Sequence, residues 1–155
     1  MRRPEEARRE VGAQVSGRRE SRIVSVSLKF WVPGPLPGMN EIVAAAKGCG
    51  GRGIAYSSMK RAWTEKVAWH ARAAGLNRRP SIRISLQLRW IEPKRKNGAT
   101  RDPDNIHAGA KFLMDGLKLA GAIPDDKQAN IASITHLPIE FGVLPGVEVT
   151  VTPVE

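Results

Sequence analysis

Residues 101–126 read RDPDNIHAGAKFLMDGLKLAGAIPDD, and this stretch places four aspartates around one predicted helix. Asp102 and Asp104 stand at its start, and Asp125 and Asp126 follow its end. The chain as a whole has 155 residues and a formal net charge of +10. An acidic cluster in so basic a protein indicates a specific role for the carboxylates.

The spacing of the apolar residues predicts the helix itself. They recur at intervals of four and three residues, which is the pattern of an amphipathic helix. The stripe consists of Ile106, Ala110, Leu113, Leu117 and Ala120. Asp104 or Asn105 is the predicted N-cap, because either side chain can accept a hydrogen bond from the first turn. Gly121 suits the left-handed position after the last turn, and Pro124 prevents the helix from continuing.

A divalent metal ion is one explanation for the carboxylates. Pro103 disfavours the α conformation for Asp102, so Asp102 and Asp104 can project to the same side. Mg²⁺ is usually held by one or two carboxylates together with waters and substrate phosphate oxygens. Lys111 lies about two turns after Asp104, and its long stem can bring the ammonium towards the pair. The alternative is that these aspartates only cap a helix and that the later two only form a turn.

Three motifs in this stretch resemble the RusA family of Holliday junction resolvases, small endonucleases common on phages and prophages. They are D-P-D-N-I at 102–106, K-F-L-M-D-G-L at 111–117 and A-G-A-I-P-D-D at 120–126. The resemblance covers the chain from Val24 to the C-terminus.

Two upstream motifs also resemble that family. The proline-rich turn at 35–40 ends in Asn40, and the pattern Y-x-S-x-x-x-x-W occupies 56–63. The resemblance therefore adds Asn40 to the residues expected to contact DNA.

The resemblance also implies a catalytic set. In the family, the two aspartates of D-x-D-N, the second aspartate of the later pair and a helix lysine act together. These match Asp102, Asp104, Asp126 and Lys111 of this sequence. The three aspartates are expected to ligate Mg²⁺, with Mn²⁺ as the alternative ion, and Asp125 would replace or support Asp126. Ala108 stands one turn after Asp104, where the family's lysine lies, so Lys111 matches with a three-residue insertion.

The predicted function is a Mg²⁺-dependent, structure-selective endodeoxyribonuclease that resolves four-way DNA junctions by paired nicks during recombination and repair. A four-way junction is close to two-fold symmetric and is cut on two strands, so an isologous homodimer is expected. The resemblance implies the same dimer. Two alternatives remain open: a nuclease for branched DNA without junction preference, and a non-catalytic DNA-binding or regulatory protein on the same scaffold.

The composition supports a polyanionic partner. The chain has 25 Lys and Arg against 15 Asp and Glu, and neutralising phosphates releases counterions and favours binding. The residues predicted to contact DNA, besides Asn40, are Lys47, Arg52, Lys94, Arg95, Lys96 and Arg101. An alternative to DNA contact remains open for both segments that carry these residues. The glycine-rich loop at 47–53 could be a flexible loop without a ligand, and the turn at 94–101 could be a solvated turn. The glycines lack the spacing of a phosphate-cradling loop, so no nucleotide cofactor is expected.

Alternating apolar and polar residues predict a small sheet. The predicted strands lie at 23–32, 81–90, 129–137 and 146–152. A second helix is predicted to begin at a cap on Ser57 or Ser58 and to end at Gly75.

The predicted fold is α/β (α+β), a small mixed β-sheet with two α-helices packed on it. The predicted order is strand, helix, strand, helix, strand, strand, in one domain over residues 23–155. Residues 1–22 carry seven arginines and four glutamates with few large apolar side chains. They are predicted to form a disordered basic tail.

Cysteine usage and hydropathy predict the compartment. The chain has a single cysteine, Cys49, which excludes an intramolecular disulfide and fits a reducing environment. No apolar run approaches the roughly 20 residues needed to span a bilayer, and the charged N-terminus does not resemble a signal peptide. The expected location is the cytoplasm of a bacterial or phage-infected cell.

Overall fold

The computed structural model describes residues 26–48, 53–77 and 83–154 of the chain. Their elements, in order, are β1 (Leu28–Pro33), α1 (Met39–Lys47), α2 (Ile54–Ala73), β2 (Arg83–Pro93), α3 (Pro103–His107), α4 (Ala110–Ala120), β3 (Ile131–His136), β4 (Glu140–Gly142) and β5 (Gly146–Val154). The predicted tail at 1–22 lies outside the described residues.

The strands form one open, mixed sheet in the order β1-β5-β2-β3. β5 pairs antiparallel with both β1 and β2, whereas β3 pairs parallel with β2. The short strand β4 continues the parallel pairing at the end of β2: β3 pairs with residues 84–88 of β2, and β4 pairs with residues 91–93. The mixed sheet confirms the predicted class, and β4 is a strand that the sequence pattern did not predict.

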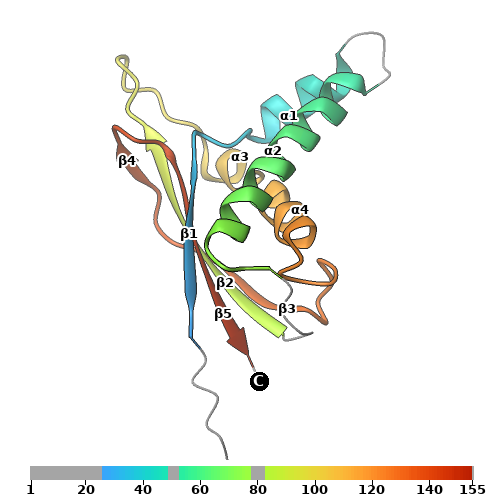
Figure 1. The fold of residues 1–155 in the computed structure, drawn as a ribbon. Coiled ribbons are helices and arrows are strands. Elements are labelled where there is room, and N and C mark those ends of the chain that lie inside the picture. Colours follow the sequence, from blue (N-terminus) through green and yellow to red (C-terminus); the bar gives the residue numbers. More distant parts are fainter. Residues whose placement is uncertain (1–25, 49–52, 78–82, 155) are drawn as a thin grey trace, which may run out of the picture.

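Alternation along β2 separates the two faces of the sheet. Ile84, Leu86, Leu88 and Trp90 are buried, and the residues between them are exposed or half-buried. Figure 1 shows the helices gathered on one side of the sheet. The predicted strand at 81–90 is confirmed over its described residues, because one face lies under the helices and the other meets solvent.

α4 and α2 pack against each other in the helical layer. Phe112, Leu113 and Leu117 of α4 are fully buried, as are Val67 and Ala71 of α2. Glycine at position 116 permits this approach. A β-carbon there would overlap the side chain of Val67 and would lie 3.2 Å from the carbonyl oxygen of Thr64.

The number and order of helices differ from the prediction. The observed order is strand, two helices, strand, two helices and three strands. α1 lies between the proline-rich turn and the glycine-rich loop, where the sequence analysis predicted no helix. None of its residues is buried, so its apolar residues gave no core pattern.

The helix after Asp102 is divided in two, which corrects the single helix and the predicted cap. α3 begins at Pro103 with Asp102 as its N-cap residue, because proline is favoured in the first helical turn. α4 begins at Ala110 after a turn. The left-handed Gly121 after α4, with φ 83°, confirms the predicted end.

α2 also begins earlier than predicted. Its N-cap is Gly53, and the predicted caps Ser57 and Ser58 lie inside the helix. The Ser57 hydroxyl donates a hydrogen bond to the Gly53 carbonyl at 3.0 Å, the backward bond typical of serine within a helix. Among the described residues, no helix is both long enough and apolar enough to cross a membrane.

Replacing Gly116 with alanine is expected to destabilise the protein. Alanine favours a helix more than glycine does, but the added methyl overpacks the α2–α4 contact, and overpacking costs about 1–3 kcal/mol. Urea unfolding of Gly116→Ala beside Leu119→Ala, a change at a 46% exposed position of the same helix, measures the difference. A Gly116→Ala protein as stable as wild type would contradict this packing.

Candidate functional site

A hollow of about 290 Å³ brings together residues from distant parts of the sequence. Its lining residues come from the start of α1, from the loop after β2 and from the start of α3. They are Asn40, Glu41, Arg95, Thr100, Arg101, Asp102 and Asn105. The proline-rich turn and the D-P-D-N motif, two stretches singled out from the sequence, thus meet at one concave surface.

Arg101 joins three parts of the chain beside this hollow. Its guanidinium donates two hydrogen bonds to the carboxylate of Glu92, at 2.8 and 2.7 Å. It also donates to the carbonyl of Leu36 at 3.0 Å and to Glu41 at 3.1 Å. These carboxylates raise the pKa of Arg101 above its ordinary value, the hydrogen bond with Glu92 being the largest cause.

Asn105 makes a second connection to the proline-rich turn. Its side-chain oxygen accepts a hydrogen bond from the backbone N–H of Asn40 at 3.0 Å. The turn also approaches closely at Gly38, where a β-carbon would lie 2.8 Å from the carbonyl oxygen of Asn105. The carboxylate of Glu41 accepts the Gly38 N–H. The start of α3 is therefore fastened to the start of α1.

Asp102 and Asp104 are both exposed. Asp102 lines the hollow, whereas Asp104, two residues further along, is not among its lining residues. Asp102 has an extended backbone, with φ −66° and ψ 147°, and its side chain makes no capping hydrogen bond. Within the described parts of the chain, neither carboxylate takes part in a hydrogen bond or an ion pair. The oxygens that a metal ion or a positively charged group would need are free.

The later aspartate pair differs from the first. Asp125 binds Lys118 at 2.7 Å and Lys127 at 3.1 Å, and it accepts the backbone N–H of Asp126. These hydrogen bonds, with Lys118 contributing most, hold the pKa of Asp125 well below its ordinary value. Asp126 itself is exposed. Each oxygen of the Asp125 carboxylate is thus paired with a lysine.

The structure does not gather all the predicted ligands into one cluster. Among the described residues, no three side chains of the types His, Cys, Asp and Glu lie close enough together to hold one metal ion. The assignment of Asp126 to the same ion as Asp102 and Asp104 therefore stays a prediction.

The predicted basic residues occupy different environments. Lys111 is exposed in the first turn of α4, and Lys47 is exposed at the end of α1. Arg95 lines the hollow with Asp102. Lys94 and Lys96 are exposed in the same loop, and Arg52 lies outside the described residues.

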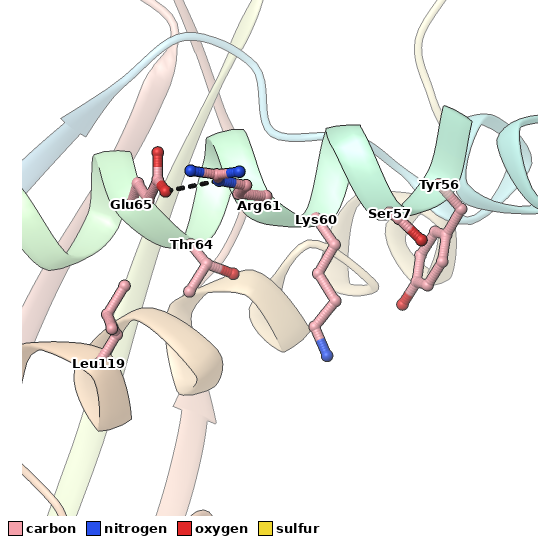
Figure 2. A pocket seen from close by; sticks show the side chains of 7 residues that line it. All are labelled: Tyr56, Ser57, Lys60, Arg61, Thr64, Glu65 and Leu119. Carbon is pink, nitrogen blue, oxygen red and sulfur yellow. Dashed lines mark hydrogen bonds and ion pairs between the residues drawn. The ribbon is translucent and has the colours of Figure 1, made fainter. Parts of the chain in front are cut away.

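A second hollow, of about 320 Å³, lies between α2 and α4. Figure 2 shows its lining, six residues of α2 opposite Leu119 of α4. Its one acidic lining residue, Glu65, is paired with Arg61 at 2.9 Å, and Lys60 reaches Asp115 of α4 at 3.3 Å. Lys60 and Asp115 join the two helices, whereas Arg61 and Glu65 pair within α2. Both acidic groups are thus already paired, so the first hollow is the better candidate for chemistry.

The comparison with protein families agrees with this geometry. The model of the family described as endodeoxyribonuclease RusA matches residues 33–152, a span that contains the proline-rich turn, the D-P-D-N motif and the later aspartate pair. The chain belongs to the RusA endodeoxyribonuclease family. No curated protein matches the sequence.

Membership in the RusA family makes this protein an endodeoxyribonuclease of the type that acts on Holliday junctions. The predicted DNA partner is thereby supported. The sequence analysis missed Glu92 and Glu41, which bind Arg101 next to the D-P-D-N motif but are distant from that motif in the sequence. One feature of the sequence could have identified Glu92: it continues the alternation of Leu88 and Trp90, so it is an acidic residue on the apolar face of a strand.

A histidine pair joins the last residue of α3 to the last residue of β3 in this RusA-family protein. The rings of His107 and His136 stack with centroids 4.0 Å apart, and Nε1 of Trp90 donates to Nδ1 of His136 at 3.0 Å. His107 Nε2 is buried and has no hydrogen-bond partner among the described residues. Burial lowers the pKa of His136 below its ordinary value of 6.5, and the charge of His107 lowers it further.

Stability is expected to fall in mild acid because of His136. Its pKa is lower in the folded protein than in the unfolded chain, so its contribution is fully present above pH 6.5 and is lost as the pH falls. The variant His136→Gln keeps an acceptor for Trp90 and should lose less stability than wild type between about pH 7.5 and 5.5. Urea unfolding at both pH values measures this, and equal losses would contradict the assignment.

Proposed function

We propose that the protein is a Mg²⁺-dependent endodeoxyribonuclease that resolves four-way DNA junctions by paired nicks, acting as a homodimer. Asp102, Asp104 and Asp126 are the proposed metal ligands and Lys111 the proposed cation beside the scissile phosphate. Mn²⁺ is the alternative ion. The observation that carries the proposal is the exposed pair Asp102 and Asp104, without protein partners in the described chain, beside the shared hollow of a RusA-family protein.

The chemistry of the two carboxylates suits Mg²⁺. This ion keeps several waters and is often bound by only one or two carboxylates plus phosphate oxygens, so a full protein cage is not required. Both carboxylates are exposed and reachable by DNA. When bound, Mg²⁺ supplies an activated water and stabilises negative charge on the phosphate.

The protein's own residues then position the DNA backbone. Carboxylates repel phosphates, so cations nearby are needed to hold the strand. Arg95 borders the hollow with Asp102, and Lys94 and Lys96 flank it in the same exposed loop. Asn40 presents its side chain at the same hollow as a hydrogen-bonding group. Lys111 is proposed to offset the charge that builds on the phosphate during cleavage.

Cleavage of a labelled four-way junction is expected to require both Mg²⁺ and Asp104. The Asp104→Asn protein keeps the shape of the side chain but loses a ligand charge, so cleavage should fall about 100-fold or more while binding persists. The measurement compares wild type and Asp104→Asn, each with Mg²⁺, Mn²⁺ or EDTA, on four-way, three-way and linear duplexes.

Glu148→Gln is the matched control, since Glu148 is an acidic residue of β5 whose partner is Lys29 of β1. It should cleave like wild type. Paired symmetric nicks on the four-way junction alone support resolution, whereas equal cutting of all branched substrates indicates a general branched-DNA nuclease. Junction binding with no cleavage by wild type in either metal would contradict the proposal and indicate a DNA-binding protein.

The protein is expected to be a dimer without DNA. Two nicks on a nearly two-fold symmetric substrate need two sites related by the same symmetry. Sedimentation equilibrium should therefore give twice the 16.9 kDa mass of one chain. A monomer that stays monomeric on the junction would contradict this part of the proposal.

A further inference from the structure

Glu92 is a charged residue in an apolar environment. It is 4% exposed and is the only charged side chain buried among the described residues. It follows Leu88 and Trp90 on the inner face of β2. An ionised carboxylate in such a place is costly unless a cation and hydrogen bonds compensate it. The fork of Arg101 provides both.

Arg101 is itself largely withdrawn from solvent. Its side chain is 10% exposed, against 59% for its second partner, Glu41. The two bonds to Glu92 match the planar fork of a guanidinium to the two oxygens of a carboxylate. The remaining contact, to the Leu36 carbonyl, ties the same group to the proline-rich turn. Four of the five N–H donors of Arg101 are therefore occupied by protein groups, which lie on three segments.

The position of Arg101 in the chain gives this pair a consequence for the site. Arg101 immediately precedes Asp102, and the residues 94–100 before it form an exposed loop. The Asp102 carboxylate makes no capping bond of its own. The backbone before Asp102 is held by the Arg101 side chain, and the helix after it is held by the hydrogen bond between Asn105 and Asn40.

We infer that Glu92 and Arg101 are positioning residues, which hold Asp102 at the hollow, and Asp104 two residues beyond it, by anchoring the backbone before them. In this account Arg101 acts through Glu92, Leu36 and Glu41, and not as a contact to DNA. The inference rests on the proposed function, because it concerns the same carboxylates.

The test separates catalytic rate from DNA affinity and from stability. The variants are Arg101→Lys, Glu92→Gln and the double variant Glu92→Met with Arg101→Met. Each is measured for single-turnover cleavage of a four-way junction with Mg²⁺, for junction affinity in EDTA, and for thermal stability. A misplacement of about 1 Å can lower a rate about 100-fold, so we expect rate losses of about that size in all three.

Two further results are expected. Junction affinity should change less than about threefold in every variant, because the anchored guanidinium makes no phosphate contact. The salt dependence of binding should also be unchanged, since only the loss of a phosphate contact would alter it. The double variant should regain the melting temperature that the single changes lose, since apolar residues can replace a buried ion pair without loss of stability. Its cleavage rate should nevertheless remain low.

Arg89 and Glu140 provide the matched control. They form the same two-bond pair at 2.8 and 2.7 Å, but their side chains are 38% and 49% exposed. Arg89→Lys should leave rate, affinity and stability unchanged, because exposed pairs contribute little.

Several outcomes would overturn the inference. Recovery of cleavage together with stability in the double variant would make the pair merely structural. A tenfold or greater loss of junction affinity in the double variant, with affinity retained in Glu92→Gln, would make Arg101 a DNA contact. Wild type that does not cleave with Mg²⁺ or Mn²⁺ would instead overturn the proposed function, and the inference with it.

Discussion

The ion pair between buried Glu92 and Arg101 connects the central strand of the sheet to the segment that carries the exposed aspartates. Glu92 ends the apolar face of β2, and Arg101 satisfies its charge from the other end of a solvent-exposed loop. The same guanidinium reaches Leu36 and Glu41. The Arg101 side chain thereby holds together the sheet, the proline-rich turn and the segment before the aspartates. Removing Glu92 or Arg101 would leave the other charge buried and unpaired.

The rest of the fold provides a rigid base for that connection. β2 is flanked on one side by β5 and on the other by β3 and β4, so its backbone is paired on both edges. The close contact of α4 with α2 at Gly116 packs the two long helices against each other in the helical layer. Asp102 precedes the short helix α3 and Asp104 lies in its first turn. The helix buries Ile106 in the core, while both carboxylates are exposed and available to solvent and to ligands.

Sequence patterns predicted the parts whose side chains alternate between core and solvent. The strand alternation around Leu86 was correct for that reason, as was the part of the apolar stripe within α4, from Leu113 to Ala120. Gly121 marked a real helix end. α1 was missed because none of its residues is buried. The candidate aspartates were found through motifs, but the partners of Arg101 were not, since charge pairing across distant segments leaves no local periodicity.

The most direct test of this account is a crystal structure of the protein on a four-way junction with Ca²⁺ in place of Mg²⁺. The account predicts an ion bound by oxygens of Asp102 and Asp104 at about 2.3–2.6 Å, next to a DNA phosphate. It also predicts that Arg101 remains on Glu92. An ion bound away from both aspartates, or an Arg101 side chain turned from Glu92 onto the DNA, would contradict it.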